Sequence, residues 1–197
     1  MGTEFDILKG KTILLASASP RRRELLGALD LKVEQAVLKD VDERYPSDLP
    51  AEEVAPFLSK LKAEAYAGEL DEHEILVTAD TVVVCGGTVL GKPADDEEAT
   101  QMLRMLSGRT HKVITGVTLT TARESRTFGE CTEVEFGNLT EREIEHYVSE
   151  YKPLDKAGAY GIQEWIGYIG ITGIKGDYYN VMGLPLNALY RNLKQMA

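Results

Sequence analysis

Hydrophobic and polar positions along the first third of the chain alternate between the spacing of strands and that of helices. Residues 12–17 form a short apolar run that ends in small polar residues, which is typical of a buried strand. Ser19 and Pro20 then suit the cap and the first position of a helix. Residues 32–37 predict a second strand. Residues 51–67 predict a helix, because apolar side chains recur there at intervals of three and four.

The middle of the sequence contains its most strand-like stretch, residues 75–84, in which Asp80 interrupts an otherwise apolar run. Gly86 and Gly87 follow, and this pair predicts a tight hairpin. An amphipathic helix and two longer antiparallel strands are predicted beyond the hairpin, the helix at residues 95–106 and the strands at 112–121 and 126–136.

The last part of the sequence begins with a clear helix start and ends with a clear helix. Thr140 and Glu143 have the spacing of a capping box, which predicts a helix that continues to residue 148. Residues 152–184 are rich in glycine and aromatic side chains and yield no assignment, whereas residues 186–196 predict a closing helix. The whole pattern predicts one α/β domain over residues 1–197, with two lobes and a cleft.

Composition and charge restrict the partners of this protein. It has 22 basic and 32 acidic residues among 197, a formal net charge of −10, and a hydrophobic fraction of 43%. Such an acidic protein is poorly suited to bind a nucleic-acid polymer, because that affinity depends on neutralising phosphates. No apolar run approaches the length of about 18 residues that a membrane span requires. A small anionic substrate in a local basic pocket remains compatible with this composition.

Two cysteines, Cys85 and Cys131, cannot build a disulfide framework or a four-cysteine metal site. Both lie in apolar or strand-like surroundings, so we expect buried free thiols. Free thiols fit a reducing compartment, and we therefore expect a cytoplasmic protein.

The segment from Ser17 to Arg23 is a candidate anion site. It places two hydroxyls and three consecutive arginines at the start of a helix, where free N–H groups favour an anion and guanidinium groups match phosphate oxygens. Helical phase favours Arg21 and Arg22 over Arg23. The alternative is an ordinary capped helix with a solvated basic first turn, although cations there oppose the helix dipole.

Single polar residues supply further candidates, each with an ordinary structural alternative. Asp80 suits a general base or metal ligand at a strand end, or equally a turn cap. Lys92, between glycine and proline, and Lys62, near the apolar face of a helix, are candidate phosphate ligands or merely solvated cations. Gln163 could read the edge of a base, although a glycine-rich turn with a buried Tyr160 is the more frequent reason for such a segment.

Several well-known chemistries are not supported by the sequence. It contains no P-loop motif, no GxGxxG segment that opens a helix after a strand, and no GxSxG nucleophile elbow. Its three histidines also lack the spacing of a metal site.

Taken together, seven segments resemble the Maf family of nucleoside triphosphate pyrophosphatases. They occur in the expected order along almost the whole sequence: residues 17–22 (SASPRR), 62–63 (KA), 79–81 (ADT), 91–93 (GKP), 106–117 (LSGRTHKVITGV), 155–163 (DKAGAYGIQ) and 180–185 (NVMGLP). The resemblance implies an α/β fold similar to that of the inosine triphosphate pyrophosphatases, with an elongated, twisted mixed sheet, flanking helices and a central cleft.

The resemblance also implies a reaction. Members hydrolyse a nucleoside triphosphate to the monophosphate and pyrophosphate with a divalent metal, Mg²⁺ or Mn²⁺, and the subgroup with these motifs acts on dTTP and UTP. Homodimers are common in such families, although no interface is evident in the sequence. The family is also linked to inhibition of septum formation, so a nucleotide-sensing regulator of cell division is the alternative function.

Roles for individual residues follow from the resemblance, position by position. Asp80 matches the catalytic proton acceptor, and Glu43 matches a second acidic residue that would hold metal together with Asp80. The remaining positions divide into a phosphate-binding set, Ser17, Arg22, Lys62 and Lys92, and a base-selecting set, Arg21, Thr81 and Gln163.

Overall fold

The computed structural model describes Leu8 and residues 10–196, which form two compact units. The first unit comprises the described residues up to Asp80, Thr115–Glu130 and residues 183–196, and the second comprises Thr81–Ile114 and Cys131–Met182. Three long strands run through both units, so the backbone passes between the units several times.

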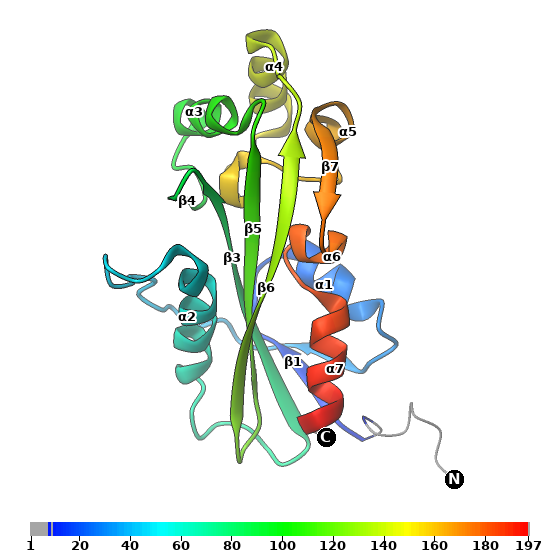
Figure 1. Cartoon of the computed structure of the whole chain (residues 1–197). Helices are drawn as coiled ribbons and strands as arrows, with labels where there is room; N and C mark the ends of the chain where they lie inside the picture. Colours follow the sequence, from blue (N-terminus) through cyan, green and yellow to red (C-terminus); the bar gives the residue numbers. More distant parts are fainter. Residues whose placement is uncertain (1–7, 9, 197) are drawn as a thin grey trace. The chain divides into compact units, whose positions relative to one another are not determined.

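Within the described residues, seven strands form one mixed sheet (Figure 1). The strand order is β2-β1-β3-β5-β6-β7, and β4 pairs with β3 outside this path. β1 runs parallel to β2 and β3, whereas the β3–β4 and β6–β7 pairs are antiparallel. The strand bounds are β1 Thr12–Leu15, β2 Val33–Gln35, β3 Glu74–Cys85, β4 Thr88–Leu90, β5 Thr110–Thr120, β6 Ser125–Phe136 and β7 Ile171–Lys175.

Helices flank this sheet, and the predicted α/β class is confirmed. The helices predicted to begin at residues 51, 95 and 186 each start within one residue of those positions. The helices are α1 Pro20–Gly27, α2 Ala51–Glu64, α3 Asp96–Leu106, α4 Glu141–Tyr151, the 3₁₀ helix η2 Ala157–Ala159, α5 Trp165–Gly170, α6 Tyr178–Val181 and α7 Leu186–Met196. In the part of the protein that the structure describes, no helix is both long and apolar enough to cross a membrane.

The first unit contains α1, α2 and α7 with the strands that they cover. Ser19 caps α1 as predicted, because its side chain accepts a hydrogen bond from the Arg22 N–H, and Pro20 occupies the first turn. Pro56 lies inside α2 without ending it. Figure 1 shows α2 and α7 on either side of the strands of this unit.

The second unit has its own hydrophobic core, which α3, α4 and the ends of the long strands share. Thr140 and Glu143 form the predicted capping box at the start of α4. Three aromatic rings contact one another in this unit: His111 stacks on Phe136 with centroids 5.5 Å apart, and the edge-to-face pair of His111 and Tyr160 has centroids 5.4 Å apart. Nε2 of His111 lies 2.7 Å from the hydroxyl of Tyr160.

Two predictions about β3 and β6 are wrong. β3 is continuous through Asp80 and Thr81, so Asp80 lies inside the strand and not at its end. A strand tolerates this carboxylate because a lysine pairs with it. Cys85 is buried as expected, but Cys131 is exposed, because successive side chains of β6 point to opposite faces and Cys131 lies on the outer one.

Residues 152–184, for which the sequence predicted nothing, contain three short helices and strand β7. None of these elements has more than six residues, which is too short for a periodic pattern to develop. The buried Tyr160 and Ile162 confirm that part of this segment belongs to the core.

The buried His111 should make the fold sensitive to mild acid. Burial lowers the pKa of His111 from 6.5 to about 4, so the folded protein resists a proton that the unfolded protein accepts. The contribution of neutral His111 to the free energy of unfolding is therefore fully present above pH 6.5. It is lost as the pH falls toward 4, by up to about 3 kcal/mol. Urea unfolding of wild type and His111→Phe across this range should show a shallower pH slope for the variant. Parallel slopes would contradict the assignment to His111.

Candidate active site

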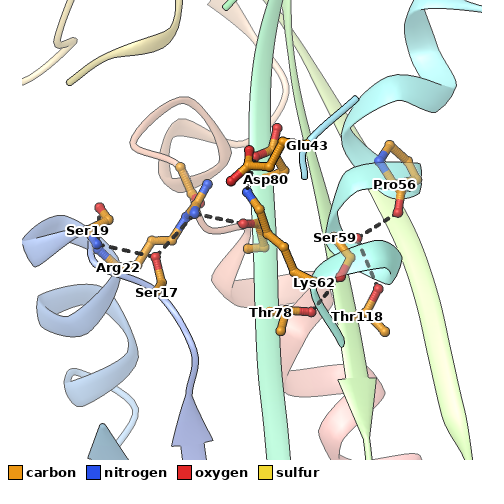
Figure 2. Close-up of polar contacts among 12 residues, drawn as sticks. Ser17, Ser19, Arg22, Glu43, Pro56, Ser59, Lys62, Thr78, Asp80 and Thr118 are labelled. Atoms are coloured by element: carbon orange, nitrogen blue, oxygen red, sulfur yellow. Dashed lines mark hydrogen bonds and ion pairs between the residues drawn. The ribbon is translucent and has the colours of Figure 1, made fainter. Parts of the chain in front are cut away.

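The loop after β1 and the start of α1 hold one polar cluster, in which Arg22 contacts three separate segments (Figure 2). Its Nε donates to the carbonyl of Gly183 at 2.8 Å, and its Nη1 donates to the carbonyl of Ala79 at 2.8 Å. Nη1 also lies 3.3 Å from Oγ of Ser17, a buried hydroxyl that accepts the N–H of Ser19. Arg22 therefore joins the end of β1 and the segment before α7 to the interior of β3.

The electrostatic surroundings of Arg22 combine desolvation with nearby acids. Burial lowers the pKa of the Arg22 guanidinium, while the negative charges of Asp80 and Glu43 oppose that shift and the neighbouring Arg21 adds to it. An arginine remains protonated at physiological pH even so. The cluster thus presents a fixed positive charge in a partly dehydrated place, where it interacts with an anion more strongly than in water.

A second cluster consists of two carboxylates on one ammonium group. Nζ of Lys62 lies 2.6 Å from Oδ1 of Asp80 and 3.0 Å from Oε2 of Glu43. The side chains of Lys62 and Asp80 are only 19% and 15% exposed, whereas that of Glu43 is 52% exposed. Figure 2 shows Glu43 and Asp80 meeting above the end of the Lys62 side chain.

Local structure explains how these three residues meet. Lys62 lies in the last turn of α2, where a cation interacts favourably with the helix dipole. Asp80 projects from the interior of β3, and Glu43 comes from the loop between β2 and α2. The helix and the strand fix the Lys62–Asp80 pair, while the loop brings the more exposed carboxylate to it.

The structure brings five of the nine predicted site residues into these two clusters: Ser17, Arg22, Glu43, Lys62 and Asp80. Arg21 is half-buried in the first turn of α1, and Arg23 is exposed and hydrogen-bonded to Gln35, as helical phase predicted. Thr81 follows Asp80 along β3 and is assigned to the second unit.

Lys92 and Gln163 also belong to the second unit, which brings their segments together. The N–H of Gly158 donates to the carbonyl of Gly91 at 3.0 Å, so the loop after β4 lies against the segment of η2. Lys92 is exposed and Gln163 is half-buried.

Sequence reasoning missed a polar network that holds the segment before Gln163. Lys156 is buried and pairs with Glu164 at 3.1 Å and with Asp155 at 2.6 Å. The hydroxyl of Tyr147 donates to Glu164 and accepts the N–H of Gly161 at 3.1 Å, and burial raises the pKa of Tyr147 above its ordinary value. The sequence could not reveal this network, because the burial of Lys156 cannot be predicted in a segment without a periodic pattern.

Comparison with known proteins agrees with this arrangement of motifs. The Maf-like protein family matches residues 12–196. The chain belongs to this family. A dTTP/UTP pyrophosphatase of Porphyromonas gingivalis strain W83 is 52% identical over 192 residues, which cover 96% of each protein. A dTTP/UTP pyrophosphatase of Phocaeicola vulgatus is also 52% identical, and the match covers 98% of this protein and all of the relative.

A solved structure supports the fold of this Maf-family protein. The HAM1 protein from Coxiella burnetii aligns with a TM-score of 0.50 over 94% of this protein and 99% of its own length, at 17% sequence identity. At such low sequence identity, the similarity is evidence for a shared fold and not for a shared function. The mixed sheet with flanking helices is therefore shared between the two proteins.

Proposed function

We propose that this protein hydrolyses dTTP and UTP to the nucleoside monophosphate and pyrophosphate. The observation that carries the proposal is its identity of about one half, over nearly the whole length, to dTTP/UTP pyrophosphatases. The two clusters of the first unit supply cationic and acidic groups suited to that reaction. Water adds across the bond between the α and β phosphates, and pyrophosphate leaves.

Cations are needed where negative charge develops on the leaving pyrophosphate. We assign phosphate binding to Ser17, Arg22, Lys62 and Lys92. Arg22 supports this role because three protein contacts already hold its guanidinium in place. A preorganised cation of this kind stabilises the transition state without reorganising during the reaction.

Asp80 is the proposed proton acceptor for the attacking water. Lys62 holds Oδ1 of this carboxylate, which fixes its orientation and leaves Oδ2 to contact a water molecule. Placement inside β3 supports the role, because a strand holds a side chain more rigidly than a loop does.

The carboxylates of Glu43 and Asp80 also suit a divalent metal. Both reach a single positive group, the ammonium of Lys62, so their oxygens converge on one region. No group of three or more His, Cys, Asp or Glu side chains suited to a metal occurs among the described residues. Two carboxylates fit Mg²⁺ or Mn²⁺, since Mg²⁺ completes its coordination with water and substrate oxygens. A bound metal would neutralise phosphate charge.

Base selection is assigned to Arg21, Thr81 and Gln163, of which Gln163 both donates and accepts hydrogen bonds. We further propose that the protein acts as a single domain with two lobes, in the cytoplasm and as a homodimer. Its net charge of −10 supports a free nucleotide over a nucleic-acid polymer as the substrate.

A nucleotide panel tests the proposed function. Purified protein with Mg²⁺ or Mn²⁺ should release pyrophosphate from dTTP and UTP, with kcat/KM at least about tenfold above that for dATP and dGTP, the range that a few base contacts provide. Release of orthophosphate would instead identify a phosphatase. Nucleotide binding without any hydrolysis would favour the alternative, a sensor that acts on cell division.

A further inference from the structure

Buried hydroxyl groups connect helix α2 to the strands beneath it. Oγ of Ser59, on α2, lies 3.0 Å from Oγ1 of Thr118 on β5, and Oγ1 of Thr118 lies 2.9 Å from Oγ1 of Thr127 on β6. On the other side, Oγ1 of Thr78 on β3 donates to the carbonyl of Ser59 at 2.7 Å. Ser59, Thr78 and Thr118 are each 0% exposed, so water does not compete for the bonds that join them, whereas Thr127 at the start of the row is exposed.

The direction of this row of hydroxyls follows from counting protons. Ser59 Oγ donates its single proton to the carbonyl of Pro56 at 2.8 Å, because a carbonyl oxygen only accepts. Thr118 must then be the donor to Ser59, and Thr127 must be the donor to Thr118. The hydrogen bonds of the row therefore run from β6 through β5 into α2 and end on the carbonyl of Pro56.

Two glycines let the helix approach the strands closely. A Cβ at Gly116 of β5 would lie 2.2 Å from backbone atoms of Ala55 and Pro56, and one at Gly129 of β6 would lie 3.1 Å from Cγ of Pro56. The backbone of α2 thus rests almost directly on the sheet. Ser59, one turn further along the helix from Pro56, makes its hydrogen bonds to Thr118 and Thr78 beside this close approach.

We infer that Ser59 and Thr118 are positioning residues for Lys62. Ser59 lies three residues before Lys62, so both side chains project from neighbouring turns of one face of α2. Thr78 lies two residues before Asp80, so both side chains point to the same face of β3. Thr118 and Thr78 therefore tie α2 to β5 and to β3, next to the point where Lys62 meets Asp80, as Figure 2 shows.

This inference rests on the proposed function, in which the Lys62–Asp80 pair binds phosphate and accepts a proton. A displacement of about 1 Å in such a group can cost up to about 10²-fold in rate. The competing explanation is that the hydroxyls contribute only to packing and stability. The two explanations differ in whether the rate follows the hydroxyl group or the shape of the side chain.

Paired substitutions at Thr118 separate hydroxyl from shape. Thr118→Val keeps the shape and removes the hydroxyl, whereas Thr118→Ser keeps the hydroxyl and removes a methyl group. We expect Thr118→Val to lower kcat for dTTP about tenfold with KM changed less than about threefold, and Thr118→Ser to stay within about twofold of wild type. Thr120→Val is the matched control, because it removes the exposed Thr120–Ser125 contact further along β5 and should leave kcat unchanged.

Ser59→Ala provides an independent variant should Thr118→Val fold poorly, and thermal unfolding of each protein establishes which are folded. We expect Ser59→Ala and Thr118→Val to lower kcat to a similar extent, and the double variant to be little worse than either, as for residues in one series of contacts. Wild-type kcat in a folded Thr118→Val or Ser59→Ala would overturn the inference. An equal loss of kcat in Thr120→Val would overturn it too.

The failure of the inference is distinguishable from that of the proposed function. If wild type releases no pyrophosphate from dTTP or UTP, the function fails, and the positioning is then tested by crystal structures of wild type and Thr118→Val. Loss of the Lys62–Asp80 contact in the variant supports the inference. An unchanged contact overturns it.

Discussion

Asp80→Asn should lower kcat for dTTP and UTP by about 10²–10⁴-fold, the contribution expected of a positioned general base, while the protein stays folded. An amide has the size of the carboxylate but cannot accept the proton of the attacking water. Lys62 keeps Glu43 as a partner at 3.0 Å, so the substitution leaves no isolated charge in the half-buried site. Steady-state pyrophosphate release and thermal unfolding measure the two effects.

Glu72→Gln is the matched control for the change of charge. Glu72 belongs to the same unit and forms an exposed ion pair with Arg123, so its substitution removes one negative charge away from the clusters. Exposed pairs contribute little to stability, and the control should retain wild-type kcat. A folded Asp80→Asn protein with the wild-type rate would exclude Asp80 as the base.

Long periodic elements of this fold are predictable from the sequence because burial repeats within them. The closing helix α7 occupies the predicted residues 186–196, and Ser19 and Thr140 cap the helices that follow them. Caps are local chemistry, in which a side-chain oxygen meets an N–H two or three residues away. The periodic pattern of α7 and the caps at Ser19 and Thr140 can each be recognised within a few neighbouring residues.

The sequence predicts which residues belong to the candidate site, but it does not predict which groups those side chains contact. Arg22 was identified from its type and position, but two of its acceptors are backbone carbonyls, of Ala79 and Gly183, that no sequence motif marks. Asp80 was predicted at a strand end, because a carboxylate inside a strand is costly unless it is paired. Its partner Lys62 is 18 residues away, and that pairing becomes visible only in the fold.

The row of hydroxyls under α2 shows the same limit for positioning residues. Ser59 and Thr118 are common residue types within a regular helix and strand, and 59 positions separate them. Gly116 gave no sign of its role either, since a glycine inside a strand also occurs at bulges and bends. Only the short distance between the backbones of α2 and β5 shows that Gly116 is needed for a close approach and not for a bulge or a bend.

Gly116→Ala should be the most damaging of the conservative substitutions in the first unit. The added Cβ would lie 2.2 Å from backbone atoms of Ala55 and Pro56, which cannot rotate away as a side chain can. We expect a loss of about 3 kcal/mol or more in the free energy of unfolding, or roughly 10 °C in Tm. Where the variant folds, α2 must move off β5, and kcat should fall because Lys62 moves with the helix.

A graded series of glycine substitutions tests whether this approach of backbones is the cause. Gly129→Ala meets only Cγ of Pro56 at 3.1 Å and should cost clearly less than Gly116→Ala. Gly27→Ala, at the end of α1, meets nothing within 4 Å and should be neutral or slightly stabilising, because alanine favours the helix. Calorimetry of the three variants should therefore rank the losses as Gly116, Gly129 and Gly27. A Gly116→Ala protein as stable as Gly27→Ala, with unchanged kcat, would mean that α2 can shift freely without disturbing Lys62.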